Sequence, residues 1–174
     1  MKYKILGSLL PIVFTLIASP MAQAGEFKPK TVNVTIEPLG FLLGLANAQV
    51  NFKVSERVAI GPTLGLLSIS SDGRTASIVE IGADAEIALN SPVFSSGFIL
   101  NPSLTYVAAS SSIISAPAIG GTLDFGYHWY WEGGLNLILA AGLSVASVAG
   151  STLGVGASSP LLTPHLGLGI GLAF

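Results

Sequence analysis

The sequence of 174 residues contains no cysteine and few charged side chains. The absence of cysteine excludes disulfide bonds, thiolate metal sites and thiol nucleophiles. Charged residues make up only 9% of the chain, against roughly 25% in an ordinary soluble domain, whereas hydrophobic residues make up 51%. The net charge is −2 and no basic patch stands out, so nucleic acid is not an expected partner. This composition is typical of a membrane protein.

After its N-terminus the chain also lacks a hydrophobic run long enough for a spanning helix, which needs about 20 apolar residues. The N-terminus itself begins with basic MKYK, continues with apolar ILGSLLPIVFTLIA, and has small residues at Ala22 and Ala24. This order is typical of a cleaved signal peptide. We expect a signal peptide at residues 1–24, a short periplasmic segment at 25–30 and one domain at 31–174. An uncleaved anchor helix is the alternative.

The rest of the chain divides into eight segments in which apolar residues recur at every second position. In the most informative one, Glu80, Asp84 and Glu86 alternate with apolar residues, a period that a strand produces and a helix does not. The predicted strands are residues 31–39, 46–54, 57–70, 76–90, 97–109, 118–130, 133–147 and 161–174. The segment 133–147 is nearly all apolar, which leaves a helical bundle as the alternative.

An even number of strands of about ten residues predicts an all-β fold, an eight-stranded antiparallel up-and-down transmembrane β-barrel. Closure of the sheet would satisfy every backbone hydrogen bond, as lipid requires. The connections at 55–57, 91–95 and 130–134 are expected to be short periplasmic turns, and those at 110–118 and 148–160 longer external loops. The Asp-Gly pair at 72–73 predicts a further turn.

Four aromatic residues cluster at one expected periplasmic turn: Tyr127, Trp129, Tyr130 and Trp131. Aromatic side chains are enriched where transmembrane barrels meet the membrane surface, so we expect this cluster to form part of an aromatic girdle. Phe52, Phe94 and Phe174 are expected at the same height. The alternative is a surface-exposed patch that binds a partner protein.

The signal peptide, the eight alternating strands and the terminal Phe174 resemble the small outer-membrane barrels of the OmpA transmembrane-domain and OmpW type. The resemblance covers Thr31 to Phe174 and rests on this pattern. It implies a location in the cell outer membrane of a Gram-negative bacterium, contact with outer-membrane lipid and lipopolysaccharide, and a monomeric barrel. It also implies that the final strand ending in Phe174 is the signal read by the barrel-assembly machinery.

The inward-facing positions are where a barrel of this size would hold a function, since its interior just accommodates side chains or one small ligand. The charges that we expect in this interior are Glu37, Lys53, Arg57, Glu80, Asp84, Glu86 and Asp124. The acids are expected to pair with Lys53 and Arg57, because an unpaired buried charge is costly. Such pairs would hold the barrel shut. The surplus of acids leaves a narrow cation-preferring channel, or a small-ligand site, as the alternative.

Enzymatic chemistry has little support in the sequence. A nucleophile needs a base within hydrogen-bond reach, and neither His128 nor His165 has the neighbours of a lipid A deacylase site. A lipid-modifying enzyme is therefore the third alternative, and a weak Ca²⁺ or Mg²⁺ site at the acidic strand is a further one. We expect no enzyme activity, no cofactor and no metal, and a structural role in membrane integrity.

Overall fold

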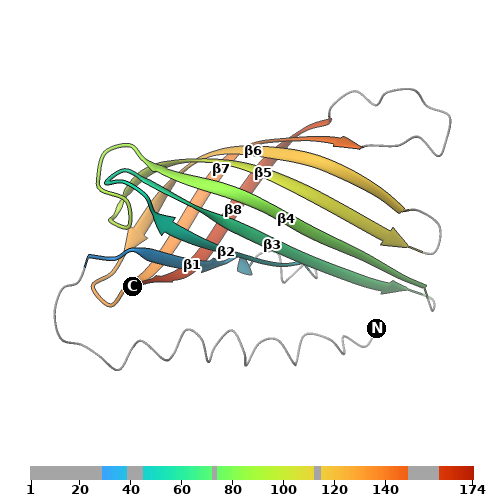
Figure 1. Cartoon of the computed structure of the whole chain (residues 1–174), viewed down its shortest axis with the longest axis horizontal. Coiled ribbons are helices and arrows are strands. Elements are labelled where there is room, and N and C mark those ends of the chain that lie inside the picture. Colours follow the sequence, from blue (N-terminus) through green and yellow to red (C-terminus); the bar gives the residue numbers. More distant parts are fainter. Residues whose placement is uncertain (1–28, 39–44, 72–73, 112–114, 149–160) are drawn as a thin grey trace.

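The computed structural model describes residues 29–38, 45–71, 74–111, 115–148 and 161–174. The strands are β1 (Val32–Ile36), β2 (Leu45–Lys53), β3 (Val58–Ser71), β4 (Arg74–Ala88), β5 (Gly97–Ser111), β6 (Ser115–Tyr130), β7 (Leu135–Val148) and β8 (Leu161–Ala173). Each strand pairs antiparallel with the next, and β1 pairs with β8, so the sheet closes into an up-and-down barrel (Figure 1). The predicted eight-stranded fold is confirmed. No helix among the described residues is long and apolar enough to cross a membrane.

The short strand β1 closes the barrel between β2 and β8. Asn33 pairs with Asn51 of β2 on one side and with Ala173 of β8 on the other. Next to this ladder, the backbone N–H of Val32 donates to the carbonyl of Phe174 at 2.9 Å, and the N–H of Phe174 donates to the carbonyl of Val32 at 2.9 Å. The last residue of the chain therefore takes part in closing the sheet.

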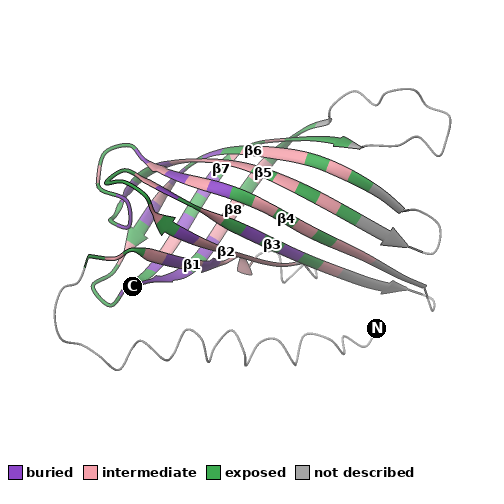
Figure 2. Cartoon of the chain, viewed as in Figure 1, coloured by how far each residue is buried: buried purple, intermediate pink, exposed green. Residues whose placement is uncertain are grey.

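Burial alternates along the strands with the period of two that the sequence predicts (Figure 2). On β4, Asp84 and Glu86 are 8% and 1% exposed, whereas Ile81 on the opposite face is 57% exposed. The outer wall is apolar, and the interior contains most of the buried polar side chains. The buried residues gather toward the end of the barrel that carries the C-terminus, called here the terminal end.

The connections at the terminal end are residues 54–57, 89–96 and 131–134. At the opposite end, Ser110 pairs with Ser115, so β5 and β6 are joined by residues 112–114 alone. The prediction of a long loop at 110–118 is therefore wrong. Pairing of strands uses backbone groups, so it continues through this serine- and alanine-rich stretch, which lacks the alternation that the prediction relied on. The predicted signal peptide, the predicted turn at 72–73 and most of 148–160 lie outside the described residues, although Ser71 pairs with Arg74 on either side of 72–73.

Candidate functional site

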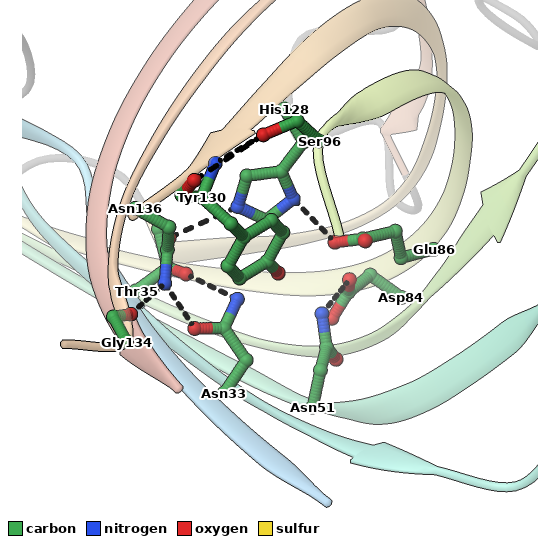
Figure 3. Close-up of polar contacts among 10 residues, drawn as sticks. All are labelled: Asn33, Thr35, Asn51, Asp84, Glu86, Ser96, His128, Tyr130, Gly134 and Asn136. Carbon is green, nitrogen blue, oxygen red and sulfur yellow. Dashed lines mark hydrogen bonds and ion pairs between the residues drawn. The ribbon is translucent and has the colours of Figure 1, made fainter. Parts of the chain in front are cut away.

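A polar network fills the interior of the barrel near its terminal end (Figure 3). Five of its members come from five different strands and are at most 1% exposed: Asn33, Asn51, Glu86, His128 and Asn136. They come together because each occupies an inward position close to the terminal end of its strand. We call these five residues the terminal network.

His128 of β6 lies at the centre of the terminal network. Its Nδ1 is 3.0 Å from Glu86 Oε2 on β4, and its Nε2 is 2.9 Å from Asn136 Oδ1 on β7. The Asn136 amide nitrogen donates to Asn33 Oδ1 at 2.8 Å and to the Gly134 carbonyl at 3.2 Å. Because the amide oxygen of Asn136 only accepts, Nε2 of His128 is the donor. Nδ1, on the other side of the ring, lies against the Glu86 carboxyl group, so His128 links β4 to β7.

Tyr130 covers the terminal network from the terminal end. Its ring centroid lies 4.0 Å from that of His128 and 6.2 Å from that of Phe94. Tyr130 was expected in the outer girdle, and that prediction is wrong. It shares the inward face of β6 with His128, whereas Trp129 between them faces outward and is 37% exposed.

The connection between β4 and β5 folds inward and completes this closure. Val93 and Phe94 are 3% and 4% exposed and pack with Ala59, Ala88 and the half-buried Tyr130. The expected place of Phe94 in the girdle is therefore also wrong.

Three further interactions stabilise the 89–96 connection and the Tyr130 ring. The N–H of Val93 donates to the carbonyl of Glu56 at 2.7 Å, which fixes the turn to the neighbouring connection at 54–57. From outside, Lys30 places Nζ 5.2 Å from the centroid of the Tyr130 ring and donates to the carbonyl of Trp131 at 3.3 Å. Partial burial lowers the pKa of Lys30.

Farther from the terminal end, Asp124 of β6 reaches His165 of β8 across the intervening strand, with Oδ2 2.8 Å from Nδ1. Gly142 of β7 pairs with both residues. A Cβ at this position would collide with the Leu123 carbonyl and with Asp124 Oδ1. The glycine therefore permits the contact between β6 and β8.

Beyond the terminal network the interior contains a cavity of about 310 Å³, called here the lumenal cavity. Its polar lining includes Glu37, Asn47, Gln49, Thr63, Glu80, Asp84, Asn101, Ser103, Thr105, Thr122, Asp124, Ser144 and His165. Several buried oxygens have no hydrogen-bond partner among the described residues, namely Oδ1 of Asn51, Asp84, Asn101 and Asp124. These oxygens are closed off from the cavity; Oδ1 of Asp124, for example, lies beside the backbone of Gly142.

The predicted pairing of interior acids with Lys53 and Arg57 is wrong for the part of the chain that the structure describes. Arg57 is exposed in the 54–57 connection and donates from Nη1 to the Leu89 carbonyl at 3.2 Å. Lys53 is half-buried at the end of β2 and forms no ion pair among these residues. Lys53 lies in the same row of the sheet as Ala59 and Glu86, but the Glu86 carboxyl group is bonded to His128.

The interior acids bond to histidine and asparagine side chains and not to the expected lysine and arginine. Besides the two histidine pairs, Asn51 Nδ2 donates to Asp84 Oδ2 at 3.0 Å, and Asn47 Nδ2 donates to Glu37 Oε2 at 3.1 Å. Glu80 lines the lumenal cavity. Asn33 is not among the residues predicted for the interior, although its position between the outward Val32 and Val34 indicates an inward side chain.

The outer wall near the terminal end carries a row of aromatic rings. Phe98 stacks on Phe125 with centroids 5.6 Å apart and meets Tyr127 edge-on at 5.1 Å, and Tyr127 lies 4.7 Å from Trp129. Trp131, in the 131–134 connection, is 49% exposed, and Phe174 is 50% exposed. Three of the four predicted girdle residues therefore lie on the outside of one end of the barrel.

Among the described residues, no cluster of three histidine, aspartate or glutamate side chains is arranged to hold a metal ion. No protein-family model matches the chain, and no curated protein matches it either. The architecture is that of an eight-stranded closed barrel with a polar interior, and it fits an outer-membrane barrel protein in general.

Proposed function

We propose that this chain is an integral outer-membrane β-barrel protein with a structural role in membrane integrity, related in type to the OmpA and OmpW barrels. The observation that carries the proposal is the reversed distribution of side chains on a closed barrel. Large apolar residues are exposed on its outside, among them Ile81, Leu104 and Leu166 at 57%, 64% and 64%, while charged and amide side chains are buried inside. Exposure of such an apolar wall to water would be unfavourable, whereas contact with the hydrocarbon of a membrane is favourable.

The dimensions and the aromatic residues support a membrane location. The strands β3 to β8 contain 13 to 16 residues, whereas about 9–11 residues of a tilted strand cross the hydrocarbon. These strands therefore suffice to span a bilayer and to extend beyond it. The row from Phe98 to Trp129 would lie at one membrane surface, where aromatic rings are favoured.

The two ends of the sequence support the proposal of an exported barrel. Residues 1–24 would direct export and be removed, and the strand ending in Phe174 would be the signal for the barrel-assembly machinery. The mature barrel would be a monomer surrounded by lipid and lipopolysaccharide. Neither His128 nor His165 bonds a serine or threonine hydroxyl among the described residues, so we propose no enzyme activity and no cofactor.

Localisation of the full chain tests this proposal. Expressed in a Gram-negative host, the chain is expected in the outer-membrane fraction with Gly25 as its N-terminal residue. On an unboiled gel it should migrate differently from a boiled sample, because a closed barrel resists denaturation by detergent. A chain that retains residues 1–24 in the inner membrane, or one recovered in a soluble fraction, would contradict the proposal. A variant with Ala22 and Ala24 both replaced by leucine is the control for processing.

The second candidate is a narrow cation-preferring channel, which the acidic lumenal cavity favours. A channel also needs an open path at the terminal end. There the five residues of the terminal network are at most 1% exposed, and Tyr130 with Phe94 packs over them. We therefore favour the closed barrel over the channel.

A further inference from the structure

The base of the 89–96 connection is fixed to the barrel on both sides. The N–H of Leu89 donates to the carbonyl of Phe98 at 2.9 Å, and the N–H of Phe98 donates to Asn90 Oδ1 at 2.7 Å. Toward β6, the N–H of Tyr130 donates to Ser96 Oγ at 2.8 Å (Figure 3). These contacts anchor the first two residues of the connection and its last residue.

Residues 91–95 between these anchors, called here the lid, have few polar contacts. Among the described residues they form one backbone hydrogen bond with another part of the barrel, from the N–H of Val93 to the carbonyl of Glu56. Apart from this bond, Val93 and Phe94 hold the lid in place by packing on the apolar cluster around Ala59. A segment that depends on one hydrogen bond and a small apolar contact can open locally while the rest of the structure stays folded.

The inward position of the lid is also strained. Phe94 has a φ of 63°, in the left-handed region, and no other non-glycine residue in the described part of the chain has a positive φ. Such a conformation is unfavourable for a large side chain. In addition, Ser91 Oγ is buried and has no hydrogen-bond partner among these residues. Both costs would be relieved if the lid turned outward, where Phe94 could adopt an ordinary φ and Ser91 could bond to water.

The lid covers a buried surface at the terminal end. Ala59 is 0% exposed beneath it, and the Phe94 ring packs near that of Tyr130, which in turn lies against His128. The hydrogen bonds of the terminal network involve no residue of the lid. An outward movement of the lid would therefore expose Ala59 and the Tyr130 ring to water without breaking the terminal network.

We propose that residues 91–95 form a hinged lid, which opens and closes over the terminal end while the barrel stays folded. In the closed position, which the structure shows, Phe94 packs inside the barrel near Tyr130. In the open position Phe94 lies outside, and water and small solutes reach the surface above the terminal network. The network itself keeps the interior closed in both positions. The inference goes beyond the structural role, and it does not depend on the membrane location because the lid and the surface that it covers belong to the barrel itself.

Thiol labelling tests the proposal, because the chain has no cysteine of its own. Ala59→Cys places a small thiol under the lid, and Ala88→Cys, which is 3% exposed in the same cluster, gives a second reporter. The purified barrel in detergent micelles would be treated with a negatively charged methanethiosulfonate, and its gel shift would show that it stays folded. Ser55→Cys, exposed in the 54–57 connection, is the accessible control, and Ile99→Cys, 1% exposed in a separate cluster, is the buried control.

The lid predicts an intermediate rate of labelling. We expect the two reporters to react at least about tenfold more slowly than Ser55→Cys and at least about tenfold faster than Ile99→Cys, because local opening occurs more often than global unfolding. Reporters as slow as Ile99→Cys would show that the lid does not open in the folded barrel. Reporters as fast as Ser55→Cys would show that the lid does not cover them. Either result would overturn the proposal.

A matched pair of substitutions tests the strain at Phe94. Phe94→Ala and Phe94→Gly both remove the ring, but only alanine retains the steric cost of a positive φ. In the Ala59→Cys background we expect labelling at least about fivefold faster with Phe94→Ala than with Phe94→Gly, since about 1 kcal/mol changes an equilibrium by roughly that factor. Equal rates in the two folded variants, or faster labelling with Phe94→Gly, would overturn the role of Phe94 in opening the lid.

Discussion

Replacing Leu104 with arginine is expected to reduce the free energy of unfolding in lipid by about 2–4 kcal/mol. Leu104 lies at the middle of β5 (Gly97–Ser111), faces outward and is 64% exposed. It pairs with Ala83 on one side and with Gly121 on the other, so no neighbouring side chain of the opposite charge is available to it. An arginine there would place its charge close to the middle of the hydrocarbon.

Urea titration of the barrel in lipid vesicles, followed by tryptophan fluorescence, measures this effect. Leu104→Ala separates the loss of apolar surface from the introduction of charge. Glu132→Arg adds the same side chain in the exposed 131–134 connection and should change stability by no more than about 1 kcal/mol, as expected near a membrane interface. If Leu104→Arg folded into lipid as well as Glu132→Arg, the outer wall would not be the lipid-facing surface.

Replacing His128 with leucine is expected to cost about 3–5 kcal/mol, because removal of one partner leaves the other buried charge uncompensated. The variant would leave the Glu86 carboxylate, which is 1% exposed, without the partner at 3.0 Å. It would also remove the donor to Asn136 Oδ1 at 2.9 Å. Both losses occur where water cannot replace the missing group.

A double-mutant cycle with Glu86→Leu measures the coupling. The double variant is expected to be less destabilised than the sum of the two single variants, since it buries no lone carboxylate. Thr122→Val is the control, because it removes a half-buried hydrogen bond to Ser144, 3.1 Å long, and should cost only about 0.5–1.5 kcal/mol. Additive single effects, or a His128→Leu variant as stable as the control, would show that the pair does not stabilise the terminal network.

The strands were predictable because period-two alternation is a local property of the sequence. The predicted strand at 76–90 corresponds to β4 (Arg74–Ala88), and its three acids do face inward or line the lumenal cavity. The same local rule also assigns Tyr130 to the inward face of β6. The prediction that placed Tyr130 in the girdle is wrong because it followed from the aromatic neighbours of Tyr130 and not from the position of Tyr130 in the strand.

The partners inside the barrel were not predictable from the sequence. His128 and Glu86 are separated by 42 positions, and His165 and Asp124 by 41. Which inward side chains meet depends on the stagger between strands, and the alternation within one strand does not specify that stagger. The expectation of lysine and arginine partners followed from charge alone. In the structure histidine and asparagine, which were already on the inward positions, fill this role.

Single-channel recording tests most directly whether the terminal network and the 89–96 connection close the barrel. The purified chain would be inserted into planar bilayers, with folding of the same sample verified by its gel shift. A closed barrel would give no conductance steps for the unmodified chain and none for a Glu80→Gln/Asp84→Asn variant. Small cation-selective steps from the unmodified chain, lost in that variant, would contradict the closed barrel and establish a channel through the lumenal cavity.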